Sequence, residues 1–194
     1  MADEVRGFAA ALVSESASAV AALSHPDLLD ALGQAADALA ARIADGATVL
    51  TFGNGGSASE AAHLAAELVG RCRVDRRPIP SLALAESGTT TTALANDYGF
   101  EDVFARQVEA FGRPGDVAVA FTTSGRSQNV VAGLRRARER GLVTIVLTGE
   151  HAETVSPYSD HVLRAPASTT PRVQECHQVW VHALAEWAEL RLPR

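Results

Sequence analysis

Two polar residues separated by four positions have the chemistry for acid–base catalysis or metal binding. His63 and Glu67 lie in residues 58–72, an alanine-rich stretch whose apolar spacing predicts a helix. Positions i and i+4 share one face of a helix, so the imidazole and the carboxylate would lie side by side. Such a pair can transfer a proton or hold a divalent metal ion. The alternative is a pair with only a structural role, at the surface or partly buried.

A second group of polar side chains interrupts an apolar stretch near the C-terminus, in the predicted helix 171–190. Its polar members are Gln174, Glu175, His177, Gln178 and His182. Combined with His63 and Glu67, the side chains of Gln174 and His182 would form a nitrogen and oxygen site suited to zinc. A buried structural histidine is the alternative for either imidazole of this helix taken alone.

The spacing of this last helix points to an oligomer. Gln174 and His182 are eight positions apart, which is roughly 12 Å along an ideal helix. Two ligands of one metal ion lie much closer together than that. Either long side chains lean toward each other or a second subunit completes the site, and we therefore expect an oligomer with a shared site.

Two loops rich in glycine and hydroxyl groups each follow a predicted strand. Residues 53–57 (Gly-Asn-Gly-Gly-Ser) follow the strand 48–52, and residues 122–127 (Thr-Thr-Ser-Gly-Arg-Ser) follow the strand 116–121. Backbone amides at a helix start, together with hydroxyls, can hold a phosphate group. The alternative is that both are tight turns and helix caps. Neither matches the dinucleotide pattern Gly-x-Gly-x-x-Gly with a following acidic residue, so we expect no nucleotide cofactor.

These residues need a scaffold in which strands alternate with helices. The apolar patterns predict helices over 4–23, 26–44, 58–72, 89–95, 102–111, 127–140 and 171–190, and strands over 48–52, 81–85, 116–121, 142–147 and 161–164. This alternation indicates an α/β fold with about five parallel strands, doubly wound, with helices on both faces. We expect one domain over 1–194, in which residues 1–45 form two N-terminal helices added outside an α/β core of residues 46–194 and packing at the oligomer interface.

The composition excludes several classes of function. The chain has 194 residues, 47% of them apolar, and a net charge of −6, which argues against nucleic-acid binding. All 17 basic residues are arginine, so a lysine Schiff base and a P-loop are both excluded. The two cysteines, Cys72 and Cys176, give no disulfide framework; we interpret them as small apolar residues. Arginines cluster in 71–77, where they could face a phosphate, a partner subunit or solvent, and in 135–140, interpreted as a solvated helix face.

The N-terminal segment predicts a cytoplasmic protein without a membrane partner. Its first residues are acidic and lack the basic region of a secretory signal, and no apolar run reaches the length needed to span a membrane.

Several motifs in a fixed order resemble those of one known family. These motifs are Gly53–Ser57 followed by His63–Leu68, Asn96–Phe100, Thr123–Ser127 and Gln174–His177. The chain resembles the sugar isomerase (SIS) domain family, specifically its phosphoheptose isomerases, over nearly its whole length. The resemblance implies a three-layer α/β/α sandwich and a homotetramer with active sites at subunit interfaces. It also implies an aldose–ketose isomerase that converts sedoheptulose 7-phosphate to D-glycero-D-manno-heptose 7-phosphate through an enediol.

The resemblance further implies roles for individual residues. Glu67 would be the general base and His182 its acid partner. The substrate-binding residues would be Asn54, Gly55, Gly56, Ser57, Glu67, Asn96, Asp97, Thr122, Thr123, Ser124, Ser127 and Gln174. Zinc, one ion per active site in members that carry it, would be held by His63, Glu67, Gln174 and His182.

The sequence departs from the family pattern in two places near the expected sugar site. Pro171 stands where many members have aspartate, and the segment 86–90 lacks the family's usual serine and histidine. These departures leave open an isomerase of another phosphosugar, a heptulose or octulose phosphate. A non-catalytic phosphosugar-binding module is the remaining alternative, and the presence of both Glu67 and His182 favours an enzyme.

Overall fold

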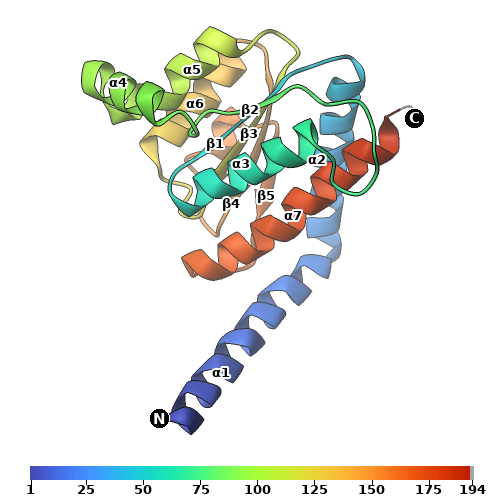
Figure 1. Cartoon of the computed structure of the whole chain (residues 1–194), viewed down its shortest axis with the longest axis vertical. Helices are drawn as coiled ribbons and strands as arrows, with labels where there is room; N and C mark the ends of the chain where they lie inside the picture. The colour runs from blue at the N-terminus through green and yellow to red at the C-terminus, as the bar shows by residue number, and fades with distance from the viewer. Residues whose placement is uncertain (193–194) are drawn as a thin grey trace.

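The computed structural model describes residues 1–192 and contains one five-stranded parallel sheet (Figure 1). The strands are β1 (Val49–Gly53), β2 (Ser81–Ala83), β3 (Val117–Thr122), β4 (Val143–Thr148) and β5 (His161–Arg164). Their order across the sheet is β2-β1-β3-β4-β5. Every residue of β1 and β3 is buried, as expected for central parallel strands covered on both faces. The predicted doubly wound α/β fold with five parallel strands is confirmed.

Helices cover both faces of the sheet and make three layers. The helices are α1 (Ala2–Ala21), α2 (Pro26–Ala44), α3 (Gly56–Val69), α4 (Gly88–Tyr98), α5 (Val103–Phe111), α6 (Gln128–Glu139) and α7 (Thr170–Arg191). One buried apolar cluster joins α2, α3 and α7 to one face of the sheet. A second cluster joins α5 and α6 to the other face, with α4 at its edge. Alternating side chains of β1, β3, β4 and β5 enter the two clusters, because successive residues of a strand point to opposite faces.

The order in which strands are added to the parallel sheet reverses between β1 and β3. Val49 of β1 pairs with Ser81 of β2 on one side and with Val117 of β3 on the other. From β1 the chain passes through α3 to β2, and from β3 it passes through α6 to β4 on the opposite side. The loops after β1 and β3 therefore meet at a topological switch point, where open α/β sheets bind their ligands. The two loops singled out in the sequence, 53–57 and 122–127, are these loops.

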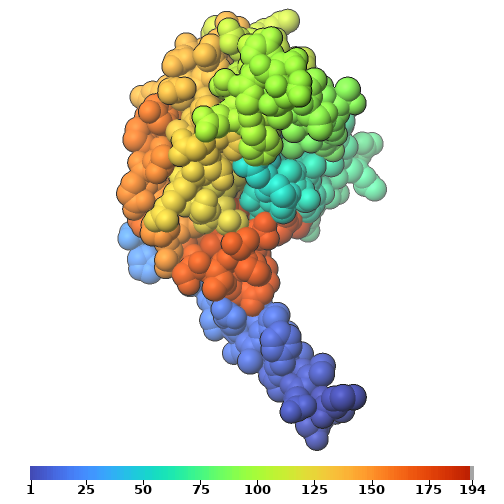
Figure 2. Space-filling model, turned by 90° about the vertical axis from the view of Figure 1, so that its left-hand side faces the viewer, coloured from blue at the N-terminus to red at the C-terminus, as the bar shows by residue number. Residues whose placement is uncertain are grey.

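The two N-terminal helices have different places in the fold, unlike the expected pair added outside the core. Helix α2 belongs to the layer of α3 and α7, because five of its side chains, Ala35, Ala36, Leu39, Ala40 and Ile43, are buried. Helix α1 has no buried residue and projects from the body as a long arm (Figure 2).

The arm also corrects an expectation from the sequence. Residues Ala2–Ser24 contain an 18-residue window of mean hydropathy 1.4, long and apolar enough to cross a membrane by length and composition alone. The statement that no apolar run reaches this length is therefore wrong. The reason is that the alanine, valine, leucine and phenylalanine residues between Gly7 and Ser24 outweigh the serines and the single charged residue, Glu15.

Candidate active site

Three side chains from α3 and α7 converge on one point. The ligand atoms of His63, Glu67 and His182 all lie within 4.8 Å of one another. On α3, the Nε2 atom of His63 is 3.2 Å from Oε1 of Glu67, as their spacing of four positions predicts. The ring of His182 on α7 meets the ring of His63 edge to face, with their centroids 5.0 Å apart. Two distant parts of the chain thus bring two imidazoles and a carboxylate together.

Gln178 on α7 orients the first imidazole. Its Oε1 atom lies 2.8 Å from Nδ1 of His63. Because an amide oxygen only accepts, Nδ1 carries the proton in this arrangement. Nε2 of the neutral ring then presents a lone pair toward the Glu67 carboxylate, whose second oxygen is buried without a hydrogen-bond partner among the described residues. Two facing lone pairs repel, and either a proton or a metal ion between them relieves this repulsion.

Gln174 lies near the N-terminal end of α7, beside the glycine loop 53–57. A Cβ atom added to Gly56 would lie 2.1 Å from Nε2 of Gln174. The amide therefore packs directly on the first residue of α3, seven positions before His63. In this chain Gln174 is placed to face the loop at the end of β1, and its proposed part in a metal site stays a prediction.

The loop after β1 has a backbone that only glycine permits. Gly55 has a φ of 56°, and a Cβ atom at Gly53 would approach the carbonyl oxygens of Ser57 and Phe121 to 2.7 and 2.8 Å. Asn54 is held by a reciprocal amide pair with Asn129 at the start of α6, at 2.8 and 2.9 Å. This pair ties the two ligand-facing loops to each other.

The loop after β3 is equally constrained and exposes hydroxyl groups. Gly125 has a φ of 64°, and a Cβ atom there would lie 1.7 Å from the carbonyl oxygen of His151. Thr122 is buried and accepts the amide of Gly125 at 3.2 Å, and Ser124 accepts the amide of Arg126. Ser127 begins α6 without capping it through its side chain, which leaves its hydroxyl and the first amides of α6 available to an anion. Thr123 is partly exposed beside them.

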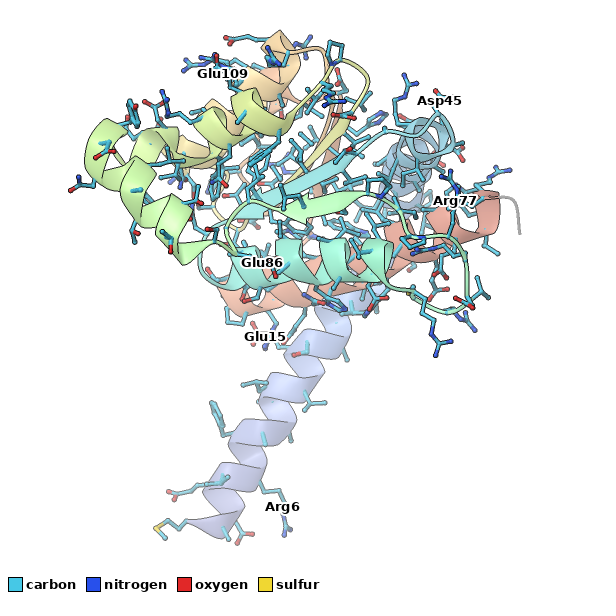
Figure 3. All side chains as sticks on the ribbon, turned by 45° about the horizontal axis from the view of Figure 1, so that its top comes forward. Arg6, Glu15, Asp45, Arg77, Glu86 and Glu109 are labelled. Atoms are coloured by element: carbon cyan, nitrogen blue, oxygen red, sulfur yellow. The ribbon has the colours of Figure 1, made fainter. Side chains whose placement is uncertain are left out.

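The remaining predicted substrate residues lie at the far end of α4. Asn96 donates to Asp97 at 2.8 Å, and both side chains are exposed. No hydrogen bond among residues 1–192 joins them to Glu67 or His182. The segment 86–90, which differs from the family pattern, leads into the first turn of α4. Its Glu86 lies over α3 (Figure 3), where it lines a hollow with Ala62 and Ala66.

Sequence reasoning missed a buried ionisable pair beneath the site. Nδ1 of His177 on α7 lies 3.4 Å from Oε2 of Glu60 on α3, and both side chains are buried. His177 also stacks near Trp180 and meets Phe121 of β3 edge-on. His177 was visible in the sequence as one of two histidines on the last helix, but nothing local distinguished its buried position from that of His182.

Cys72 lies beside Glu67 and is chemically quiet. Burial and the neighbouring Glu67 carboxylate raise the pKa of its thiol to about 11. The thiol is therefore protonated at neutral pH and is a weak nucleophile. Burial also raises the pKa of Cys176 to about 11.

The converging side chains are open to solvent in the single chain. His182 is exposed, and the side chains of His63 and Glu67 are 35% and 21% exposed. A site that moves protons beside a carbonyl works best when water is excluded. The single chain therefore carries these three side chains on its surface without enclosing them.

The chain is similar to known proteins over most of its length. The SIS domain family matches residues 14–149. The phosphoheptose isomerase of Aquifex aeolicus is 49% identical over 151 residues, which cover 78% of this chain and 79% of that protein. The phosphoheptose isomerase of Rhodospirillum rubrum is 41% identical over 189 residues, 97% of each chain. The solved phosphoheptose isomerase from Neisseria gonorrhoeae superposes with a TM-score of 0.89 at 34% identity, covering 96% of this chain and 99% of that one.

Proposed function

Because this chain belongs to the phosphoheptose isomerases of the SIS domain family, we propose that it converts sedoheptulose 7-phosphate to D-glycero-D-manno-heptose 7-phosphate, with Glu67 and His182 as the proton-transfer pair. The observation that carries this proposal is the convergence of Glu67 on α3 and His182 on α7, together with His63, within 4.8 Å. The reaction moves a carbonyl between C2 and C1, and it needs one base, one acid and no redox cofactor.

The proton transfers balance between these two side chains. The Glu67 carboxylate removes a proton from C1 while the His182 imidazolium gives one to the C2 oxygen, which forms the enediol. The imidazole then takes the proton from the C1 oxygen, and Glu67 returns its proton to C2. The product is an aldehyde at C1, and both side chains regain their starting forms.

The loops at the switch point supply the grip on the substrate. We assign the phosphate to the loop after β3, with Thr122, Thr123, Ser124 and Ser127 and the first amides of α6 as donors. The support is the free Ser127 hydroxyl and the glycine backbone that brings the loop close to a ligand. The remaining contacts proposed for the sugar are Asn54, Gly55, Gly56, Ser57, Asn96, Asp97 and Gln174.

A zinc ion fits the donor set at the convergence point. Two imidazoles and a carboxylate are typical zinc donors, and one oxygen of the Glu67 carboxylate has no hydrogen-bond partner among the described residues. We propose His63, Glu67, Gln174 and His182 as the ligands. When bound, the ion would polarise the sugar oxygens. Metal binding would compete with proton transfer at Glu67 and His182, because both use the same lone pairs.

We further propose a cytoplasmic homotetramer in which a neighbouring subunit completes each site. The support is the exposure of His182 and of the whole α1 arm in the single chain. The apolar side chains of α1 would be covered by the other subunits, and the neighbouring chain would close the site over the sugar.

The test is an NMR assay of sedoheptulose 7-phosphate with the wild type and Glu67→Gln, run with and without added zinc. Removing the base lowers turnover by about 10²- to 10⁴-fold, while phosphosugar binding and assembly persist. Glu101→Gln, at an exposed position outside the site, is the control and keeps wild-type turnover.

Different outcomes separate the competing functions. Near-normal turnover by Glu67→Gln rejects the assignment of the base. A wild type that binds phosphosugars without turnover indicates a binding module. Turnover only of another heptulose or octulose phosphate assigns a different substrate, which the departures at Pro171 and residues 86–90 leave open.

A further inference from the structure

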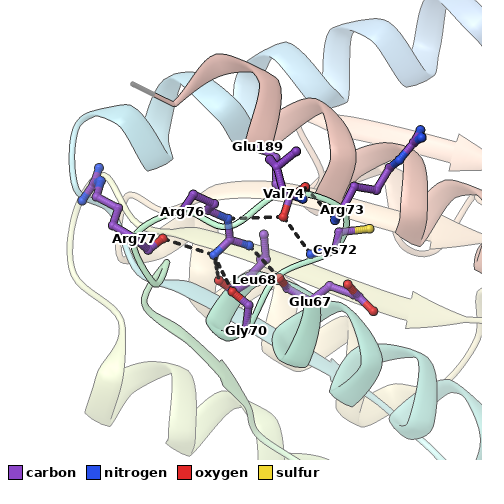
Figure 4. Close-up of polar contacts among 9 residues, drawn as sticks. All are labelled: Glu67, Leu68, Gly70, Cys72, Arg73, Val74, Arg76, Arg77 and Glu189. Atoms are coloured by element: carbon purple, nitrogen blue, oxygen red, sulfur yellow. Dashed lines mark hydrogen bonds and ion pairs between the residues drawn. The ribbon is translucent and has the colours of Figure 1, made fainter. Parts of the chain in front are cut away.

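The connection between α3 and β2 is fastened to α7 by a buried ion pair. Arg76 lies in this connection and Glu189 lies near the end of α7. Nε of Arg76 is 3.5 Å from Oε1 of Glu189, and their side chains are only 2% and 1% exposed. Figure 4 shows the two side chains between the end of α3 and the last turns of α7. Buried charges of this kind are retained when they make several further hydrogen bonds.

The Arg76 guanidinium caps the last turn of α3. It donates to the carbonyl oxygens of Glu67, Leu68 and Gly70 at 2.6, 2.7 and 3.0 Å. Carbonyls at the end of a helix lack partners within the helix, and a positive charge there is favourable. One of the gripped carbonyls belongs to Glu67 itself. The guanidinium therefore holds the backbone of the residue proposed as the base.

The Glu189 carboxylate fastens the same segment from the other side. It accepts the backbone amides of Cys72, Arg73 and Val74 at 2.7, 2.9 and 3.2 Å. Glu189 lies seven positions after His182 on α7, two turns along the same helix. An unbroken set of contacts thus leads from the backbone of Glu67, through Arg76 and Glu189, to the helix that carries His182.

We infer that Arg76 and Glu189 are positioning residues for the isomerase reaction. This inference rests on the role proposed for Glu67. Helix α3 ends at Val69, so Glu67 stands in a terminal turn, where helices fray. A base that must reach a carbon-bound proton loses rate steeply when it is displaced. The Arg76–Glu189 clamp holds this terminal turn against α7 and keeps the carboxylate opposite His182.

The test compares Arg76→Met, Glu189→Gln and the double variant with the wild type. Turnover is measured well below each variant's unfolding temperature, and light scattering confirms the wild-type assembly. We expect kcat to fall about 10- to 100-fold with KM within about 3-fold. The double variant is no slower than the slower single variant, because the two residues act as one unit. Arg136→Met, which breaks an exposed ion pair with Glu109 on α5, is the matched control and keeps wild-type kcat.

A second readout does not depend on activity. Hydrogen exchange of residues 64–70 is faster in Arg76→Met than in wild type, while α6 is unchanged. If Arg76→Met does not fold, Glu189→Gln carries the test, because its single amide oxygen can still accept the amides of Arg73 and Val74.

Two results overturn the inference: wild-type kcat in the folded variants, or unchanged exchange in the last turn of α3. The Glu67→Gln variant in the same assay distinguishes a wrong inference about Arg76 and Glu189 from a wrong assignment of the catalytic base. An inactive Glu67→Gln beside a fully active Arg76→Met rejects only the clamp. An active Glu67→Gln rejects the base itself.

Discussion

At the scale of single residues, the glycines of the two loops decide how closely the backbone approaches a ligand. Gly125 combines a φ of 64° with a Cβ position 1.7 Å from the carbonyl oxygen of His151. Gly46, at the end of α2, has a φ of 88° but nothing within 4 Å of its Cβ position. Both glycines have the left-handed backbone, but only the Cβ position of Gly125 is crowded by neighbouring atoms. Comparing them therefore separates the cost of backbone strain from the cost of steric contact.

We expect Gly125→Ala to be far more harmful than Gly46→Ala. The left-handed backbone alone costs about 1 kcal/mol for alanine, and at Gly125 the contact with His151 also displaces the loop that we assign to the phosphate. Urea unfolding should show a loss of more than about 2 kcal/mol for Gly125→Ala and a raised KM. Equal losses in the two variants would contradict the crowding argument.

The sequence pointed to the side chains that converge in the structure better than to the residues that hold them in place. His63 and Glu67 were paired by helical periodicity, and His182 was singled out as one of the polar residues of the last predicted helix. Asn129, Gln178 and the Arg76–Glu189 pair were missed, because their contacts join positions 75 to 117 residues apart and leave no local pattern. Arg76 was noticed only as one of several clustered arginines, with no means of telling which one was buried.

At the scale of secondary-structure elements, the predicted boundaries were close wherever the end of an element is set locally. The helix Pro26–Ala44 and the strand His161–Arg164 have the predicted bounds, since proline and glycine delimit the helix. The helix predicted over 58–72 ends instead at Val69. Gly70 is its C-cap residue, with a non-helical ψ of −115°, and Arg76 donates to the carbonyl oxygens of this last turn from outside the helix.

The anchoring of residues 72–74 on α7 should depend on pH through Glu189. Burial favours the neutral carboxyl, but the amides of Arg73, Cys72 and Val74 and the charge of Arg76 outweigh burial and lower the pKa of Glu189. A carboxylate with a lowered pKa contributes stability above its unfolded pKa and loses it as the pH falls through the folded value. This stability is complete above about pH 5 and declines toward acid.

Urea unfolding of the wild type and Glu189→Gln across a pH series measures this contribution. We expect the wild type's advantage in the free energy of unfolding to be largest above about pH 5 and to shrink toward about pH 3. Glu101→Gln, at an exposed position, should instead follow the wild type throughout. A difference between the wild type and Glu189→Gln that stays constant with pH would show that Glu189 acts without its charge.

At the scale of the whole molecule, α1 is held at its base and bare along its length. Arg172 of α7 lies 3.4 Å from both the carbonyl oxygen of Leu12 and the carboxylate of Glu15. Beyond this anchor Val5, Phe8 and Leu12 form an exposed apolar stripe on one helix face. An exposed apolar stripe of this kind marks a candidate interaction surface.

We expect light scattering at micromolar concentration to give a tetramer for the wild type and a smaller species for Phe8→Glu/Leu12→Glu. Two buried carboxylates in the proposed interface are strongly unfavourable. Ser14→Glu, on the opposite face of α1, keeps the tetramer. A monomeric wild type would remove the argument for a shared site, and a wild type that partitions onto lipid vesicles would show that the apolar stripe serves a membrane.

The pairing of α3 with α7 has a consequence for biosynthesis. Because the ribosome synthesises a chain from its N-terminus, the strands and the glycine loops leave the ribosome before residues Thr170–Arg191. Until then the apolar face of α3 is uncovered and Glu67 has no imidazole from α7 opposite it. A nascent polypeptide therefore lacks one member of the proposed proton-transfer pair, and the site can be assembled only after the last helix has been translated.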